Sequence, residues 1–178
     1  MDDRVWLQSY PANIPATMPV SPFPSLADLL DDSLRKFAGQ PAFHNLGHTL
    51  SFREIDDLSR KFAAYLQSLP GVVKGDRVAV MMPNVLQYPV ALFGILRAGL
   101  IVVNVNPLYT ARELGIQLMD AGAKVILIME NFAATLQEAL PGLPIEHVVT
   151  TQIGDLLPTP KRWLVNFVIK YVKKMVPR

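Results

Sequence analysis

Three asparagine-bearing turns are the residues best placed to act on a ligand. They lie at 82–84 (MPN), 104–107 (NVNP) and 130–131 (EN), and each ends an apolar run typical of a buried strand. If those strands are parallel, their carboxyl ends share one edge of a sheet, where such folds bind ligands. The simpler interpretation, which we favour, is that Asn84 and Asn131 cap helices and that the NVNP segment is a turn.

Other chemistries are excluded by residue type or spacing. The chain has no cysteine, which excludes disulfides, thiolate metal sites and cysteine nucleophiles. His44, His48 and His147 show no metal-ligand spacing. Gly94 and Gly99 are spaced suggestively, but no Lys-Ser/Thr pair follows them, so they do not form a phosphate loop. We therefore predict no catalytic, cofactor-binding or metal-binding residue in this chain.

The C-terminal segment, 158–178, carries the strongest functional signal. A stiff Pro-Thr-Pro spacer precedes 161–176, which we expect to be a basic amphipathic helix. Aromatic side chains beside lysines suit the interface between a membrane and water. The residues predicted to contact a membrane are Trp163, Phe167, Lys170, Tyr171, Lys173 and Lys174. The alternative is that the wide apolar face of this helix packs on its own protein.

Charge is unevenly distributed along the chain. Residues 161–178 hold six basic and no acidic residues, whereas 1–160 hold 11 basic and 15 acidic residues. The acidic body disfavours nucleic-acid binding, because phosphates require a basic surface. Basic residues near a membrane attract anionic lipids, each contributing about 1 kcal/mol. The opening residues, MDDRVW, are acidic where a secretory signal would be basic, which predicts a cytoplasmic chain.

The central part of the chain predicts an α/β fold. Strand-like runs begin near residues 77, 100, 124 and 147, and helical segments at 85–98, 111–121 and 132–140 separate them. Strand–helix–strand units of this length form parallel strands joined by right-handed crossovers. We expect 25–157 to contain a partial parallel layer of about four strands with covering helices.

The elements before that layer are predicted from caps and turns. The proline-rich segment 1–24 is expected to be an extended arm that wraps the surface. Ser25 begins a helix, residues 42–51 form a small hairpin, and Ser51 caps a second helix. The apolar stretch 85–105 contains a proline, an arginine and two glycines. We interpret it as a buried helix, a turn and a buried strand rather than a transmembrane helix.

Three stretches resemble the adenylate-forming superfamily of acyl-CoA synthetases. They are GDRVAVMMPNVLQYPVALFGILRAG at 75–99, NVNPLYTARE at 104–113, and the strand that follows DAGA at 120–123. Their order, spacing and residue types all match. The opening VWLQSYPANIP and the tail NFVIKYVKKMVP look like bacterial long-chain fatty acid–CoA ligases. The resemblance covers essentially the whole chain.

The resemblance implies an enzyme that uses ATP and Mg²⁺ to join a fatty acid to coenzyme A through an acyl-adenylate, at the periphery of the inner membrane. It implies that this chain is an N-terminal portion. The family's phosphate loop, ribose-binding aspartate and catalytic lysine lie downstream, so we expect these residues to be inactive alone. The alternative is a non-catalytic module that docks on membranes or on a ligase. Exposed apolar surface also leaves open a homo-oligomer.

Overall fold

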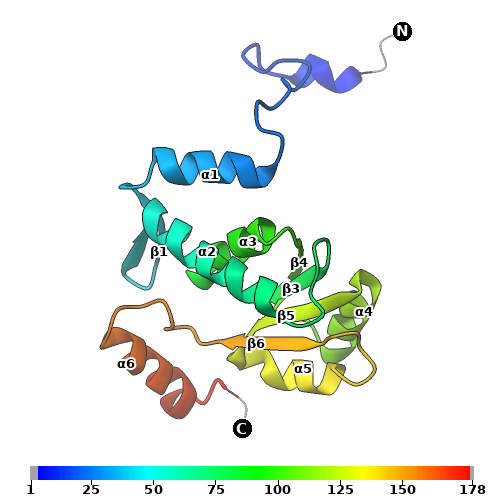
Figure 1. Ribbon diagram of the computed structural model, residues 1–178. Coiled ribbons are helices and arrows are strands. Elements are labelled where there is room, and N and C mark those ends of the chain that lie inside the picture. Colours follow the sequence, from blue (N-terminus) through cyan, green and yellow to red (C-terminus); the bar gives the residue numbers. More distant parts are fainter. Residues whose placement is uncertain (1–3, 177–178) are drawn as a thin grey trace.

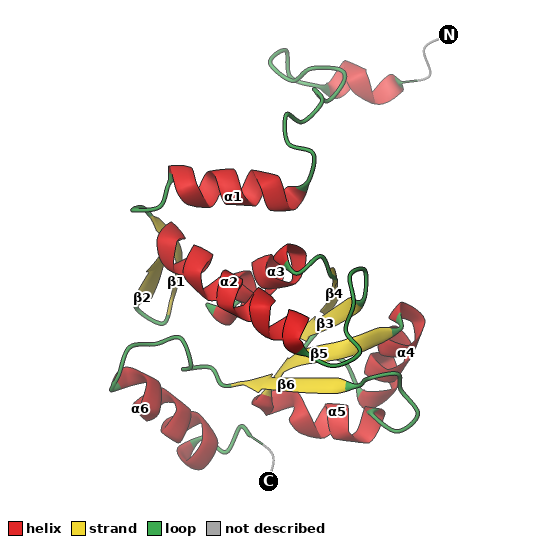
Figure 2. Ribbon diagram, viewed as in Figure 1, coloured by secondary structure: helices red, strands yellow, loops and turns green. Residues whose placement is uncertain are grey.

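The computed structural model describes residues 4–176, in which a two-stranded hairpin and six α-helices accompany a four-stranded sheet (Figures 1 and 2). The α-helices are α1 (Leu26–Lys36), α2 (Phe52–Ser68), α3 (Gln87–Arg97), α4 (Ala111–Ala121), α5 (Ala133–Ala139) and α6 (Lys161–Phe167). The strands are β1 (Pro41–Asn45), β2 (His48–Ser51), β3 (Arg77–Met81), β4 (Ile101–Val105), β5 (Ala123–Met129) and β6 (His147–Thr151). Shorter helical segments are η1 (Val5–Ser9), η2 (Glu130–Phe132) and η3 (Val168–Val172). The predicted parallel layer, hairpin and preceding helices are confirmed.

The sheet has the strand order β4-β3-β5-β6, and all neighbouring strands are parallel. The chain runs from β3 outward to β4 and then crosses back to place β5 on the other side of β3. Because right-handed crossovers fix the face on which each connecting helix lies, this reversal puts helices on both faces. Helices α2 and α3 cover one face, and α4 and α5 cover the other.

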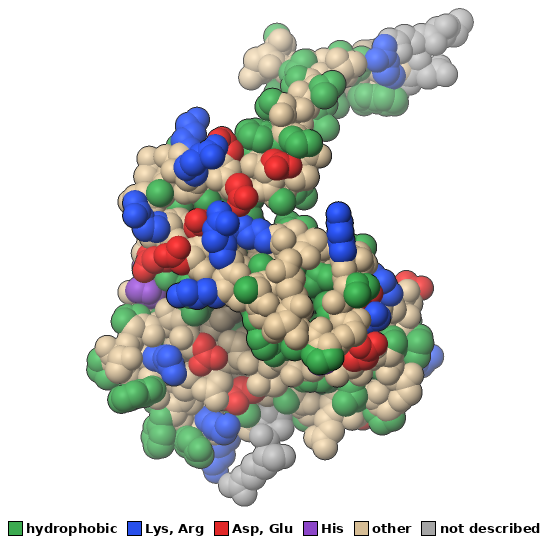
Figure 3. All heavy atoms as spheres, viewed as in Figure 1, with side chains coloured by type: hydrophobic (Ala, Val, Ile, Leu, Met, Phe, Trp, Pro, Cys, Tyr) green, Lys and Arg blue, Asp and Glu red, His purple; other side chains and the backbone are tan. Residues whose placement is uncertain are grey.

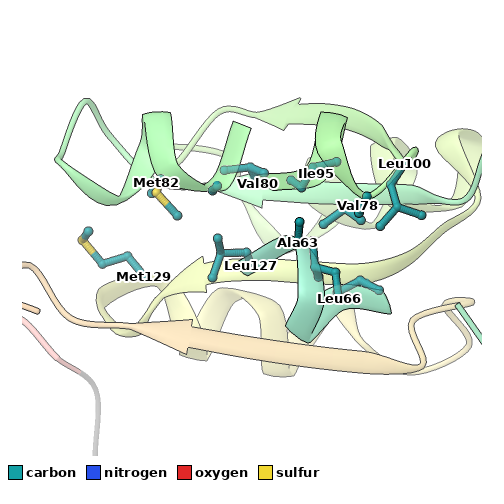
Figure 4. Close-up of a cluster of buried hydrophobic side chains, with 12 residues drawn as sticks. Ala63, Leu66, Val78, Val80, Met82, Ile95, Leu100, Leu127 and Met129 are labelled. Atoms are coloured by element: carbon teal, nitrogen blue, oxygen red, sulfur yellow. The ribbon is translucent and has the colours of Figure 1, made fainter. Parts of the chain in front are cut away.

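The buried side chains of β5 alternate between the two faces of the sheet. On the α2/α3 face, Leu127 packs in a cluster with Val80 of β3 and Ile95 of α3 (Figure 4). On the opposite face, Ile126 packs in a cluster with Leu118 of α4. Strands buried on both faces must be apolar throughout, which explains the continuous apolar runs in the sequence.

Helices α2 and α3 approach closely at Gly94. A Cβ added there would lie 2.8 Å from the ring of Phe62. The guanidinium of Arg97, also on α3, is 7% exposed and forms ion pairs with Asp31 of α1 and Asp56 of α2. One arginine therefore fixes three helices to one another, because losing either partner would leave a buried cation underpaired.

The amino ends of two neighbouring strands are joined by Asp76, which immediately precedes β3. Its carboxylate accepts a hydrogen bond from the Val73 amide at 2.8 Å and another from Nζ of Lys124 at 3.0 Å. The Val73 hydrogen bond first, and the Lys124 interaction second, hold the pKa of Asp76 below its usual range. Since Lys124 belongs to β5, this ion pair ties the start of β3 to the start of β5.

Local sequence signals fix the start of several helices. Capping boxes form at Ser51 with Glu54 and at Thr110 with Glu113, as the sequence predicts. Hydrogen bonds from the backbone and then the side chain of each capping residue lower the pKa of both glutamates. Helix α3 begins at Gln87 and not at Val85, which is the start that the position of Pro89 allows: Pro89 then lies in the first turn, where a missing N–H costs no helical hydrogen bond.

The N-terminal arm differs from the expectation. In its described part, from residue 4 onward, it contains η1 and projects away from the body instead of wrapping its surface (Figure 1). Met18 and Val20 are 92% and 96% exposed. The five prolines between residues 9 and 24 lack amide donors, so the arm has few groups with which to join a sheet or helix.

The apolar stretch 85–105 forms helix α3, a turn and strand β4, as predicted. The expectation that the strand is buried is wrong, because β4 lies at the edge of the sheet and only Val105 of its five residues is buried. The turn is made by Gly99, whose φ of 76° is accessible to glycine at little cost. Across residues 4–176, no helix combines the length and apolar character needed to cross a membrane.

Candidate functional site

The C-terminal segment is held against the body at both ends. Helix α6 continues directly into η3, giving one helical run from Lys161 to Val172, called the tail helix below. At its start, the Lys161 ammonium donates a hydrogen bond to the Leu46 carbonyl in the hairpin turn. Near its end, Nζ of Lys170 lies 3.4 Å from Oε2 of Glu130 in η2. The tail helix therefore bridges the hairpin and the carboxyl edge of the sheet (Figure 1).

Asn166 anchors the middle of the tail helix. Its Oδ1 accepts a hydrogen bond from the Gly154 amide at 2.7 Å, and its Nδ2 donates to Oδ1 of Asp155 at 3.1 Å. The other oxygen of Asp155 accepts from the Gln152 amide at 2.7 Å and from the Thr151 hydroxyl at 3.0 Å. This carboxylate thus connects the end of β6 to the polar side of the tail helix. No local sequence pattern identifies Asp155, because its partner Asn166 lies 11 residues away.

Most of the large apolar side chains of the tail helix point away from the body, whereas Val165 packs against the buried cluster that contains Leu34 and Leu157. Neither α6 nor η3 contains a buried residue. The exposed apolar patch consists of Trp163, Leu164, Phe167, Tyr171, Val172 and Met175, each more than half exposed. Hydrophobic side chains gather over α6 in the space-filling view (Figure 3). Polar residues and Val165 hold this helix in place, and the exposed apolar patch meets solvent.

The tail helix ends earlier than the predicted residue 176, and its last turn is wider than an α-turn. The Lys173 amide donates to the Val168 carbonyl at 2.8 Å, the i→i+5 bond of a π-helix. Lys174 then takes a left-handed conformation with φ of 50°, which stops the helix. The rings of Phe167 and Tyr171 lie 5.2 Å apart across this turn.

The structure divides the six predicted membrane-contact residues into two groups. Five are exposed, namely Trp163, Phe167, Tyr171, Lys173 and Lys174. Lys170 is only 39% exposed and points its ammonium at Glu130, so much of its charge is directed toward the body. A helical wheel groups Lys170 with the other lysines, because the wheel contains no information on the distant Glu130.

Two of the asparagine-bearing turns do not act as we interpreted them. Helix α3 has Leu86 at its N-cap and α5 has Phe132, and neither cap uses a side-chain hydrogen bond. The assignment of Asn84 and Asn131 as caps is therefore wrong. The reason is that two residues, Val85 and Leu86, separate Asn84 from the start of α3, and that Asn131 lies inside the 3₁₀ segment η2, which ends one residue later, before α5 begins.

Two polar side chains at the carboxyl edge of the sheet donate or accept hydrogen bonds within the chain, although Oδ1 of Asn131 is buried without a partner among the described residues. Asn106 accepts a hydrogen bond from the Leu108 amide at 3.0 Å, which confirms the predicted turn. Nδ2 of Asn131, just beyond β5, donates to the Met175 carbonyl at 3.0 Å. The tail thus contacts the sheet near the point where the strand order reverses, which is where open α/β sheets bind ligands.

Within 4–176, no three His, Cys, Asp or Glu side chains are grouped as a metal site would require. Cations at the edges of the fold are neutralised by carboxylates: Lys124 by Asp76 and Lys170 by Glu130. The prediction that Mg²⁺ and ATP are not held by residues of this chain stays a prediction.

Comparison with known proteins shows which family this fold and sequence define. A family model described as "AMP-binding enzyme" matches residues 30–176, and the chain belongs to that family. It is 55% identical over 175 residues to the long-chain-fatty-acid–CoA ligase of Escherichia coli O157:H7, covering 98% of this chain. It is 39% identical over 161 residues to the ligase of that name from Bacillus subtilis (strain 168). The chain spans only 31% and 28% of the lengths of these two relatives.

Solved structures agree with this assignment. A long-chain-fatty-acid–CoA ligase from Archaeoglobus fulgidus superposes with a TM-score of 0.65 at 26% identity, covering 78% of this chain and 30% of that one. An anthranilate–CoA ligase in complex with anthranoyl-AMP gives a TM-score of 0.66 at 25% identity, covering 70% and 24%. The partial parallel layer is therefore a recurrent part of AMP-binding ligases.

Proposed function

We propose that this chain supplies the N-terminal part of a long-chain fatty acid–CoA ligase, which converts a fatty acid, ATP and coenzyme A into acyl-CoA, AMP and pyrophosphate. The main support is the 55% identity over 98% of the chain to a protein of that name. The role proposed for these residues is structural: the sheet and its helices form one layer of the large domain.

These 178 residues are not expected to catalyse the reaction by themselves. Adenylation requires donors and cations grouped around the transferring phosphoryl charge, together with a positioned carboxylate. In the described part of the chain, Arg97, Lys124 and Lys170 are all paired with carboxylates of the fold. Their charges stabilise the protein rather than facing an open site.

A chimera tests this proposal directly. The present chain would replace the matching part of the Escherichia coli O157:H7 ligase, and ATP–pyrophosphate exchange dependent on a long-chain fatty acid would be measured. We expect exchange from the chimera and none from the 178-residue chain alone. A soluble, folded chimera without exchange would refute the proposed family role, and exchange by the isolated chain would refute its dependence on other residues.

We further propose that the tail helix contacts an anionic membrane surface. The exposed apolar patch lies beside two exposed lysines, Lys173 and Lys174, and polar contacts hold the helix in this orientation. Apolar side chains inserted among lipid headgroups and lysines attracted to anionic lipids act together in such interfacial helices. Peripheral location at the inner membrane is proposed on the same basis.

Sedimentation with liposomes separates the two contributions. Trp163→Ala with Phe167→Ala is expected to weaken binding to all vesicles, whereas Lys173→Glu with Lys174→Glu is expected to weaken it only for anionic vesicles. The control is Arg53→Glu with Lys61→Glu, an equal charge change on exposed positions of α2. Equal binding by the lysine variant and the control would remove the electrostatic part of the proposal.

A docking module without catalysis is the second candidate, and the exposed apolar patch favours it equally. It predicts that the chain docks on vesicles or on a full-length ligase without contributing to catalysis. Co-sedimentation with liposomes and pull-down with the Escherichia coli O157:H7 ligase, run on the same preparation, distinguish the two partners.

A further inference from the structure

A groove of about 310 Å³ lies between the tail helix and the loop that joins β6 to α6 (Figure 1). Residues four apart lie one above another on a helix, so the tail helix presents two neighbouring rows to this groove. The polar row is Arg162, Asn166 and Lys170, the aromatic row is Trp163, Phe167 and Tyr171, and Gln152 and Asp155 lie on the side of the loop. Ligand sites have volumes of about 300 to 1,000 Å³, so this groove has room for a small polar group.

Arg162 carries the charge in this groove that is available to a ligand. Its side chain is exposed, and no ion pair or hydrogen bond joins its guanidinium to another residue between 4 and 176. The other charged groups of the lining are engaged: Lys170 pairs with Glu130, and the Asp155 carboxylate accepts the hydrogen bonds described above. An anion that enters the groove would therefore meet a free guanidinium that solvent already reaches.

A phosphodiester is the anion that this end of the groove fits best. A guanidinium donates two parallel hydrogen bonds to two oxygens of one phosphate group, which an ammonium cannot do. A phosphodiester carries a single negative charge, so Asp155 repels it less than it would repel a doubly charged phosphate monoester. The side-chain amide of Gln152 has no partner within the described chain and can bond a hydroxyl next to the phosphate.

The aromatic row indicates that the phosphodiester belongs to a lipid. Trp163, Phe167 and Tyr171 line the groove and are between 56% and 65% exposed. A free phosphate would leave these rings in water, whereas acyl chains would cover them. We propose that the groove binds the headgroup of one anionic phospholipid, with its phosphate on Arg162 and its acyl chains over the aromatic row. This site rests on the membrane contact proposed above and names the lipid that makes it.

Monomeric short-chain lipids test the groove without a membrane. NMR titration of the 178-residue chain compares dihexanoyl-phosphatidylglycerol, dihexanoyl-phosphatidylcholine and inorganic phosphate, with both lipids below their critical micelle concentrations. We expect saturable shifts of the Trp163 indole and the Gly154 amide with phosphatidylglycerol, and affinities about tenfold lower for the other two probes. Absence of saturable shifts, or equal affinity for the two lipids, would overturn the proposal. Inorganic phosphate that binds as tightly as the lipid would also overturn it, because the site would then be one for free anions.

Substitution of Arg162 separates this groove from the general charge of the tail helix. Arg162→Gln should lower the affinity for monomeric phosphatidylglycerol about tenfold, and Arg162→Lys should restore only part of it. The control is Arg53→Gln, the same charge change at an exposed position of α2, which should bind as the wild type does. Amide spectra that match the wild type show that each variant is folded. Unchanged affinity of Arg162→Gln would place the lipid elsewhere and overturn the proposal.

Sedimentation distinguishes the groove from the membrane contact on which it rests. If the chain sediments with phosphatidylglycerol vesicles but does not bind the monomeric lipid, the groove is wrong and the membrane contact stands. If the chain binds the monomeric lipid but does not sediment with vesicles, the membrane contact is wrong and the groove stands.

Discussion

Strand β5 and the tail helix are both rich in apolar residues, but they are held in place by opposite means. Six of the seven residues of β5 are buried, and they pack against helices on both faces of the sheet. No residue of the tail helix is fully buried, and hydrogen bonds of its polar side chains, together with the packing of Val165, hold it on the body. Apolar content alone therefore does not tell which side of an element packs on the protein.

Strand β5 and the tail helix therefore also differ in how much they stabilise the fold and in how much apolar surface they leave free for a partner. Burial of apolar surface stabilises a fold by about 25 cal/mol per Å², so β5 contributes strongly to the core. Hydrogen bonds to exposed or half-exposed groups contribute only about 1 kcal/mol each. The tail helix can thus be positioned by its polar side while its apolar patch stays available for a partner. Four predictions test this comparison.

The largest effect is expected from Ile126→Ala in β5, which is fully buried. Removing three carbons from a well-packed site costs about 2–5 kcal/mol of unfolding free energy, from lost burial and the cavity left behind. Urea denaturation measures it. The control is Val148→Ala on β6, which is 45% exposed and should change stability by less than about 0.5 kcal/mol. Similar losses in both variants would contradict the view that β5 is the central strand of the core.

A matched pair of glycine substitutions tests the contact between α2 and α3. Gly94→Ala would place a Cβ 2.8 Å from Phe62, and overpacking of this kind costs about 1–3 kcal/mol. Gly115→Ala on α4 meets no atom within 4 Å and should stabilise the protein by about 0.5–1 kcal/mol, because alanine favours the helix. The midpoints of thermal and urea unfolding should be lower than in the wild type for Gly94→Ala and higher for Gly115→Ala. The same sign for both would refute the close approach at Gly94.

The Asp76→Asn variant tests whether a buried polar contact stabilises the fold more than the exposed polar contacts of the tail helix do. The folded-state pKa of Asp76 is lowered, so the stability provided by its ionised form is present above about pH 4, the unfolded value. It is lost as the pH falls through the lower folded-state value. At pH 7 we expect the variant to be less stable by about 1 kcal/mol, and the two stability curves should converge in acid. Urea titrations from pH 7 to pH 2 check this, with the exposed Asp120→Asn as control.

The smallest global effect is expected from Asn166→Ala in the tail helix. It removes the hydrogen bonds to Gly154 and Asp155, but buries no less apolar surface. The unfolding free energy should change by less than about 0.5 kcal/mol, because water replaces these half-exposed hydrogen bonds, and amide exchange within α6 should accelerate about twofold through local opening. A loss of global stability comparable to that of Ile126→Ala would show that the tail helix belongs to the core.

Much of the fold could be predicted because its signals are local. The capping boxes at Ser51 and Thr110 fix helix starts within four residues of sequence. The apolar runs of β3 and β5 identify buried parallel strands, since both faces of each are covered. Helix α4 matches its predicted bounds, 111–121, because a cap begins it and Gly122 ends it in a left-handed conformation.

The remaining features depend on contacts distant in sequence. The orientation of the tail helix is set by Glu130 and Leu46, which lie 40 and 115 residues from their lysine partners. Either face of this amphipathic helix could have packed on the body, so its pattern left both alternatives open.

The strand order has a consequence for how the chain acquires its structure during synthesis. Strand β3 lies between β4 and β5, and Arg77 is paired with both Ile101 and Ala123. The centre of the sheet therefore cannot close until the ribosome has delivered β5, although β3 emerges much earlier. Until then, the apolar strand β3 has one unpaired edge, and a partly folded chain with such an edge is prone to aggregation. Slowing translation just after β5 has emerged should raise the yield of soluble protein, whereas slowing it just before should lower that yield.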